Sequence, residues 1–166
     1  MQSMDSRLVK IVEAMRIIST AVGFSLAYKA LEHPPTDQAI RTLTLTYAIS
    51  LCGTCAFEGL FLAKATAKEK GYDHGQEVRV NPYHRQNTMW FLSASIVGVA
   101  WASNSTTTVN ALLLYITLTG GFFILSAINH AWEAIAHGNS TWQNLNRPFL
   151  LLAMAGASIQ IALSYR

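Results

Sequence analysis

The chain has 166 residues, of which 51% are hydrophobic, and its formal net charge is +3. This length predicts one domain. The basic residues form no patch interleaved with aromatic side chains, which argues against a nucleic-acid partner. Charge is instead absent from long stretches: residues 43–63 contain one charged side chain, Glu58, and residues 88–128 and 148–165 contain no Lys, Arg, Asp, Glu or His. A bilayer core requires such stretches, so we predict an all-α integral membrane protein.

The charge-free stretches and the turn residues between them predict a bundle of about five transmembrane helices in a single domain. Taken in chain order, the predicted spans are 11–31, 43–63, 88–103, 109–135 and 148–165. Pro148 is expected in the first turn of the last helix, where its missing N–H is tolerated. The lipid bilayer is therefore the first expected partner.

Basic residues favour the cytoplasmic side of a membrane and so predict the orientation. With five spans, nine basic residues fall on one side: Arg7, Lys10, Arg16, Lys64, Lys68, Lys70, Arg79, Arg85 and Arg147. The other side receives three, Lys29, Arg41 and Arg166. We expect a cell-membrane protein with a cytoplasmic N-terminus and an external C-terminus. If the first helix lay in the membrane plane instead of crossing it, the basic loop between Lys64 and Arg85 would fall on the outside. That placement conflicts with the preference of basic residues for the cytoplasmic side, so we reject it.

Both cysteines lie in the second predicted span, as Cys52-Gly53-Thr54-Cys55. A thiol oxidoreductase needs a thiolate near water, and a structural zinc site needs four ligands, so neither fits well. A Cu(I) site built from the two thiols and a methionine stays open, and the thiols are weak metal candidates. Close helix packing is the preferred reading of these small residues. Helical rotation places Glu58 off the face that Cys52 and Cys55 share.

Glu58 is an intramembrane carboxylate, which is a functional hypothesis by default because burying a charge in lipid is unfavourable. Further polar residues are expected at the same, inner end of the bundle. They are His130, Glu133, His137, Asn81, His84, Asn139 and Asn144. Together with Glu58 they form the predicted polar cluster.

Three interpretations of this cluster compete. The polar groups satisfy one another and cap helix ends, as membrane backbones require. Alternatively, Glu58 and His130 handle protons or cations, for which a carboxylate and an imidazole are suitable. The third interpretation is a metal or haem held by His130 with His137 or His84. These residues alone do not lead us to predict a cofactor. No nucleophile–base arrangement and no phosphate-binding loop is recognisable, so no catalytic residues are predicted.

One stretch, "INHAWEAIAHGNSTWQNLNRPFLLLA", resembles an uncharacterised family of small multi-span prokaryotic membrane proteins, a domain of unknown function. The resemblance rests on His130, Gly138, Asn139 and Asn144, and on Asn81-Pro82-Tyr83 ahead of a span. It covers roughly the C-terminal half. It implies a shared fold and a shared polar face, and it brings no known activity.

The sequence leads us to expect a non-catalytic subunit or accessory protein of a larger membrane complex, with a membrane enzyme complex among the alternatives, and with other subunits or further copies as partners. Small residues suited to helix association support this: Gly53 and Gly59, Ala94 and Gly98, and Gly120 with Gly121. The alternative is a small transporter coupled to protons or cations through Glu58 and His130. A metal- or haem-binding subunit ranks third.

Overall fold

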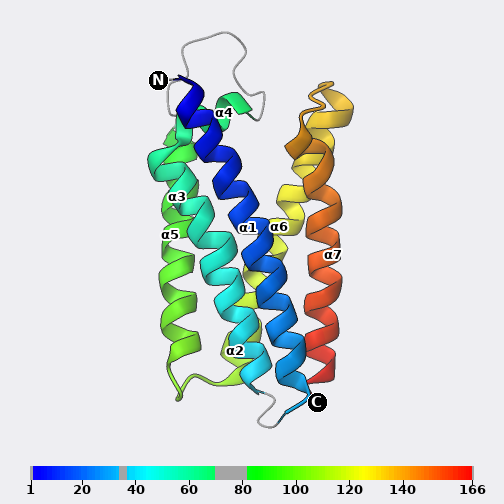
Figure 1. The fold of residues 1–166 in the computed structure, drawn as a ribbon. Coiled ribbons are helices and arrows are strands. Elements are labelled where there is room, and N and C mark those ends of the chain that lie inside the picture. Colours follow the sequence, from blue (N-terminus) through cyan, green and yellow to red (C-terminus); the bar gives the residue numbers. More distant parts are fainter. Residues whose placement is uncertain (1, 34–36, 70–81, 166) are drawn as a thin grey trace.

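The computed structural model describes residues 2–33, 37–69 and 82–165, with side chains from residue 7 onward. This part of the chain is helical and forms an elongated bundle (Figure 1). In chain order the elements are α1 (Gln2–Leu31), α2 (Asp37–Leu45), η1 (Thr46–Gly53), α3 (Thr54–Phe61), α4 (Ala63–Glu69), α5 (Pro82–Ser103), α6 (Val109–Ala136) and α7 (Trp142–Ser164).

Four helical stretches are long and apolar enough to cross a membrane, which indicates a multi-pass membrane protein in contact with lipid. They are Arg7–Leu31, Asp37–Phe61, Val109–Ala136 and Trp142–Ser164. The fifth long helix, α5, has 22 residues but is less apolar, because Gln86, Asn87 and several serines interrupt its hydrophobic run.

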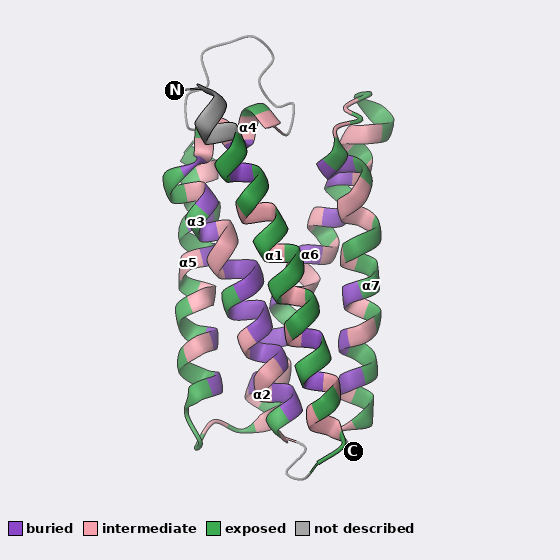
Figure 2. Ribbon diagram, viewed as in Figure 1, coloured by how far each residue is buried: buried purple, intermediate pink, exposed green. Residues whose placement is uncertain are grey.

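The helix formed by α2, η1 and α3 is the centre of the bundle. Within its most apolar window 56% of residues are buried, against 22% for α1 and 17% for α7. Figure 2 accordingly shows buried residues concentrated on α2 and η1 and exposed residues along α1 and α7. The outer helices expose apolar side chains that suit contact with lipid.

The middle of this central helix is π-helical over eight residues, Thr46–Gly53. Threonine hydroxyls on either side bond to their own backbone, with Thr46 donating to Thr42 O at 2.8 Å and Thr54 donating to Ser50 O at 2.6 Å. Such bonds satisfy the hydroxyl groups without a hydrogen-bond partner on another helix, and they accompany departures from regular α geometry. The helix ends at Phe61, and Leu62 (φ −123°) separates it from α4.

Most of the glycines expected to serve helix association are used inside this chain. A Cβ at Gly59 would collide with Thr88 of α5, and one at Gly98 would collide with Tyr115 and Ala48. A Cβ at Gly120 would lie 3.3 Å from the Tyr47 hydroxyl, whereas one at Gly121 would meet nothing within 4 Å. Close packing between α3 and α5 and between η1, α5 and α6 therefore depends on these small residues.

The expectation that Pro148 opens the last helix is wrong. The helix α7 begins at Trp142, with Thr141 at its N-cap, so Pro148 lies in its interior. A proline there cannot donate to the carbonyl of Asn144, four residues earlier. The polar side chains of the preceding turns, Gln143 and Asn144, are buried, and their contacts hold this part of the chain in helical geometry ahead of the proline.

The two ends of the bundle differ. Figure 1 shows the N-terminus, α4 and the α6–α7 connection at one end, where α6 and α7 stand apart from α1 and α5. The C-terminal ends of α1 and α7, the start of α2 and the α5–α6 connection lie at the other end. We call the first the cavity end and the second the closed end.

Arg41 of α2 fixes the closed end. Its guanidinium donates to the backbone carbonyl of Ala102 (3.2 Å) in the last turn of α5 and to three carbonyls of the α5–α6 connection, those of Asn104 (2.8 Å), Ser105 (3.3 Å) and Thr107 (3.0 Å). Its Nε also lies 3.3 Å from Asp37, one turn earlier. These contacts satisfy carbonyls at the C-terminal end of α5, which lack helical partners.

Candidate functional site

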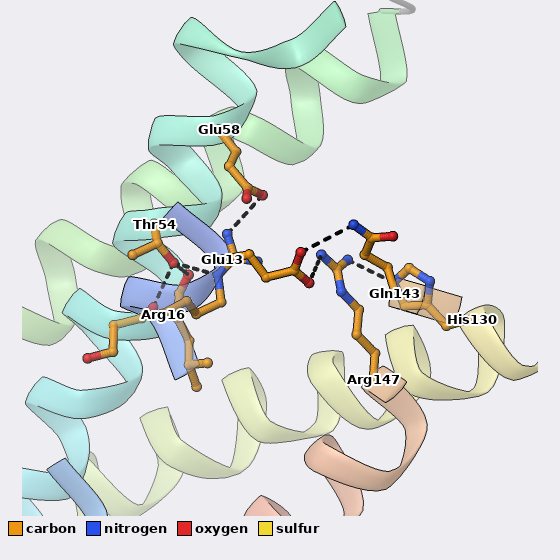
Figure 3. A network of polar contacts seen from close by, with 9 residues as sticks. Glu13, Arg16, Thr54, Glu58, His130, Gln143 and Arg147 are labelled. Atoms are coloured by element: carbon orange, nitrogen blue, oxygen red, sulfur yellow. Dashed lines mark hydrogen bonds and ion pairs between the residues drawn. The ribbon is translucent and has the colours of Figure 1, made fainter. Parts of the chain in front are cut away.

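Glu58 of α3 forms a buried ion pair with Arg16 of α1. Arg16 Nη2 lies 2.8 Å from Glu58 Oε2, and the side chains are 11% and 5% exposed, respectively. Figure 3 shows the two side chains meeting between their helices. The charge of Glu58 is therefore matched inside the bundle, and its partner is an arginine of the first helix.

Arg16 is held by a second contact on the central helix. Its Nε donates to Thr54 Oγ1 at 2.7 Å, and the same hydroxyl donates to Ser50 O at 2.6 Å. Thr54 and Glu58 are four residues apart, so they lie on one face of α3 and together receive the guanidinium. Breaking one partner of such a buried pair leaves an uncompensated charge and is strongly destabilising.

A second ion pair connects α1 to α7. Glu13 lies one turn before Arg16, and its Oε1 is 3.5 Å from Arg147 Nη2. Its Oε2 accepts a hydrogen bond from Gln143 Nε2 at 3.2 Å. Because Arg16 and Glu13 extend from the same face of α1 to different helices, α1 bridges the central helix and α7 (Figure 3).

His130 of α6 continues this network in a defined protonation state. Arg147 Nη1 lies 3.1 Å from His130 Nε2. A guanidinium can only donate, so Nε2 accepts and carries no proton. The proton is then on Nδ1, which donates to Asn144 Oδ1 at 2.7 Å, and Asn144 Nδ2 donates to Asn139 O at 2.9 Å. His130 is therefore neutral in this arrangement.

These polar groups border a cavity of about 510 Å³ between the helices. Its charged lining residues are Glu13, Arg16, Glu58 and Arg147, with His84 and His130 beside them. Its apolar lining includes Phe24, Phe91, Phe122, Phe123 and Met154. Phe91 packs against Phe122 edge to face, with ring centroids 5.2 Å apart, and against Phe123 at 5.9 Å. The cavity thus joins a charged lining to aromatic walls.

Three oxygens on the cavity lining are buried without a hydrogen-bond partner among the described residues. They are Thr20 Oγ1 on α1, Glu58 Oε1 on α3 and Thr66 Oγ1 on α4. A buried polar group left unsatisfied costs about 1–3 kcal/mol. Such groups are normally met by water or a ligand, so the cavity is suited to a molecule that supplies hydrogen bonds.

The predicted polar cluster is only partly assembled. Glu58, His130 and His84 line the cavity, and Asn144 lies beside His130. Glu133 and Asn139 contribute backbone groups to the α6–α7 connection, where Asn139 N donates to Glu133 O at 3.1 Å. His137 is exposed at the C-cap of α6, and Asn81 lies outside the described residues.

Sequence reasoning missed Glu13, Arg16, Gln143 and Arg147. In the sequence analysis, Arg16 and Arg147 enter only as basic residues that predict the orientation, and Glu13 and Gln143 are not considered. A signal was present: Glu13 and Arg16 are three residues apart within a predicted span, so one helix face carries two opposite charges. Arginine in a membrane helix is unfavourable unless it is paired, which points to buried carboxylates as partners.

The two cysteines have different surroundings. Both are free; Cys52 is fully buried on η1, while Cys55 is half-buried and lines the cavity together with Glu58. The prediction that helical rotation separates Glu58 from both thiols thus does not hold for Cys55, which lines the same cavity. Residues three apart remain on neighbouring parts of a helix face, and cavity walls span more than one residue row. Within the described ranges, no group of three or more His, Cys, Asp or Glu side chains is placed so that it could hold a metal ion.

Comparison with protein-family models, curated proteins and solved structures finds no match to this chain. The resemblance to a family of small prokaryotic membrane proteins therefore stays a prediction, and function is argued from the site alone.

Proposed function

We propose that this protein is a small, non-catalytic membrane carrier coupled to protons or cations, with its working site at the charged lining of the cavity. In this proposal α5 also crosses the cell membrane, which gives five spans in all. The N-terminus is then cytoplasmic and the C-terminus external. The distribution of basic residues supports that orientation.

The observation that carries the proposal is the pair of salt bridges on the lining of one cavity inside an apolar bundle. Charged residues within membrane helices are rare and commonly mark substrate or ion pathways. A role in helix packing alone would not require a cavity. A cavity left by imperfect packing would not require charged residues on its lining. Their combination favours transport over passive helix packing.

The arrangement of the two ion pairs suggests how such a carrier works. Glu13 and Arg16 connect α1 to α7 and to α3. A proton or cation that binds Glu58 or Glu13 weakens the attraction to the paired arginine and so loosens one helix contact. Alternating which contact is broken would change which side of the cavity is open. His130 could take up a proton at Nε2 only if Arg147 moved away, so this contact is a second one that a proton would break.

Flux across reconstituted liposomes tests this proposal. Proteoliposomes are given a pH gradient and a membrane potential, and proton, sodium and potassium fluxes are compared with those of protein-free liposomes. We expect at least one flux to exceed the background and to fall about tenfold or more when Arg16→Gln and Glu58→Gln are combined. The double variant removes both charges, so neither is stranded.

The matched control is Glu32→Gln, which removes an exposed carboxylate beyond the end of α1. Its fluxes should equal those of the wild type. Wild-type fluxes equal to the background for all three ions would contradict the proposed coupling. Labelling of a cysteine introduced at Lys68 from outside intact cells would contradict the proposed orientation.

A subunit or accessory role is the second candidate, favoured by a groove between α5 and α6. The groove has a volume of about 860 Å³ and is mostly apolar, with Trp90, Trp101, Leu118 and Gly121 among its lining residues. Gly121 is open, so the backbone of a partner's transmembrane helix could approach α6 there. Native mass measurement after mild extraction decides: a monomer without co-purifying subunits argues against this role.

A further inference from the structure

The cavity has a charge balance that restricts what it can bind. Each carboxylate on its lining is paired with an arginine, Glu58 with Arg16 and Glu13 with Arg147. The hydrogen bonds of His130 leave its ring neutral. A proton or a small cation can displace an arginine from its carboxylate, but a large charged ligand would enter a low-dielectric cavity without a free counter-charge, which is unfavourable.

The unsatisfied atoms of the lining call for a ligand that donates hydrogen bonds. Glu58 Oε1, as a carboxylate oxygen, can only accept a hydrogen bond. The hydroxyls of Thr20 and Thr66 both accept and donate. Glu58 and Thr66 are only 4% and 3% exposed, so bulk solvent does not satisfy these groups. A hydroxyl group is complementary to all three, because it donates and accepts at one atom.

The remaining walls favour an aromatic or aliphatic body. Phe24, Phe91, Phe122 and Phe123 line the cavity, and three of these rings pack on one another at centroid separations of 5.2–5.9 Å. A volume of about 510 Å³ is in the range that encloses a drug-sized molecule. Such a ligand would dissolve in the surrounding lipid and reach the cavity from there.

We propose that the cavity binds a neutral, lipid-soluble molecule with a hydroxyl head and an apolar, preferably aromatic, body. The hydroxyl head bonds to Glu58 Oε1 and reaches the threonine hydroxyls directly or through a bridging water, and the body lies against the phenylalanines. This inference rests on the proposed function in that it names the solute class of the same cavity.

Binding to the full chain in lipid nanodiscs tests the inference, and it needs no ion flux. The probe is radiolabelled para-octylphenol, and retention by empty nanodiscs is subtracted. Its methyl ether keeps the body but cannot donate. Tetraphenylphosphonium and octyl sulfate represent cations and anions. We expect saturable phenol binding, about tenfold weaker binding of the ether, and no saturable binding of either ion at the same concentration.

Variants connect the binding to the named atoms. Thr20→Val and Thr66→Val each remove a hydroxyl with little change of shape, and each should weaken phenol binding about fivefold, as expected for one hydrogen bond. The control is Thr117→Val, whose hydroxyl is exposed and bonds to Leu113 O on its own helix. It should leave binding unchanged. If Thr66→Val does not fold, Thr20→Val and the double variant Arg16→Gln with Glu58→Gln carry the test, and the double variant should also weaken phenol binding.

Equal binding of the phenol and its ether would overturn the inference, as would tighter binding of either ion or no saturable phenol binding. Failure of this assay with normal ion flux would leave the carrier proposal intact and reject the ligand class. Phenol binding without any flux would keep the ligand class and reject ion coupling.

Discussion

Both ends of this bundle bury arginines, and they do so in contrasting ways. At the closed end, Arg41 bonds mainly to backbone carbonyls of a short connection, and its side chain is 13% exposed. At the cavity end, Arg16 and Arg147 pair with carboxylates beside a cavity and bond to few other groups. A guanidinium bound by many carbonyls fixes a loop, whereas one bound by a single carboxylate can change partner. The comparison therefore separates a structural site from a site able to do work.

The largest effect is expected at the cavity end when one charge is removed alone. Glu58→Leu leaves Arg16 buried without its counter-charge and should destabilise the protein by about 3–5 kcal/mol. Adding Arg16→Met should restore most of that stability without restoring ion flux, since a neutral apolar pair is tolerated. Unfolding in mixed detergent measures both variants. If Glu58→Leu is as stable as the wild type, the ion pair is not the structural element described above.

At the closed end the expected loss is smaller and has no functional counterpart. Arg41→Met removes hydrogen bonds to several carbonyls and should cost about 2–3 kcal/mol. The folded fraction should keep wild-type ion flux, because the cavity is lined by other residues. If Arg41→Met lost as much ion flux as the cavity variants at the same amount of folded protein, the two ends would not differ in function.

Added volume should also distinguish the closely packed interior from the cavity. Gly98→Ala places a Cβ against Tyr115 and Ala48 and should destabilise by about 1–3 kcal/mol. Ser126→Leu places a larger group on the cavity lining and should change stability by less than about 1 kcal/mol. The same variant should block phenol binding. Thermal unfolding in nanodiscs compares the two, and an equally destabilising Ser126→Leu would show that the cavity is filled by its own side chains.

The smallest effects are expected at the cysteines. Cys52→Ala removes a fully buried sulfur and should cost about 1 kcal/mol through the space left behind. Cys55→Ala on the cavity lining should change stability by less than about 0.5 kcal/mol. Unfolding midpoints of the two variants test this order. A loss of ion flux in Cys55→Ala would add the thiol to the working site.

Much of this outline could be predicted from charge patterning. The stretch without charge from 109 to 128 predicted α6, whose observed end at Ala136 is one residue from the expected one. The start of α7 at Trp142 could not be predicted, because Gln143, Asn144 and Pro148 are poor helix signals until tertiary contacts satisfy them. The early start of the central helix at Asp37 likewise depends on the contacts of Arg41 with another connection.

The candidate site was predicted in composition more than in pairing. Glu58 and His130 follow from the rule that buried ionisable residues are functional candidates, and both line the cavity. Their partners, Arg16 and Arg147, come from helices distant in sequence. Pairing across 42 and 17 residues depends on the rotation of each helix about its axis, which a single sequence does not specify. The π-helical segment on the central helix makes that rotation harder still to foresee.

This π-helical segment has a consequence for insertions and deletions in the chain. Its wider turns between Thr46 and Gly53 set the angular position of α3 relative to α2. Deleting one residue there, such as the exposed Ile49, would let the segment return to α-helical winding. The tighter α-helical winding, about 100° per residue, would offset most of the rotation that the lost residue supplied, so the Glu58 carboxylate would still face α1. A single codon lost within α3 ahead of Glu58 would instead turn the carboxylate by about 100° and disconnect the two halves of the charge network, so the π-helical segment is the part of the central helix that best absorbs such a loss.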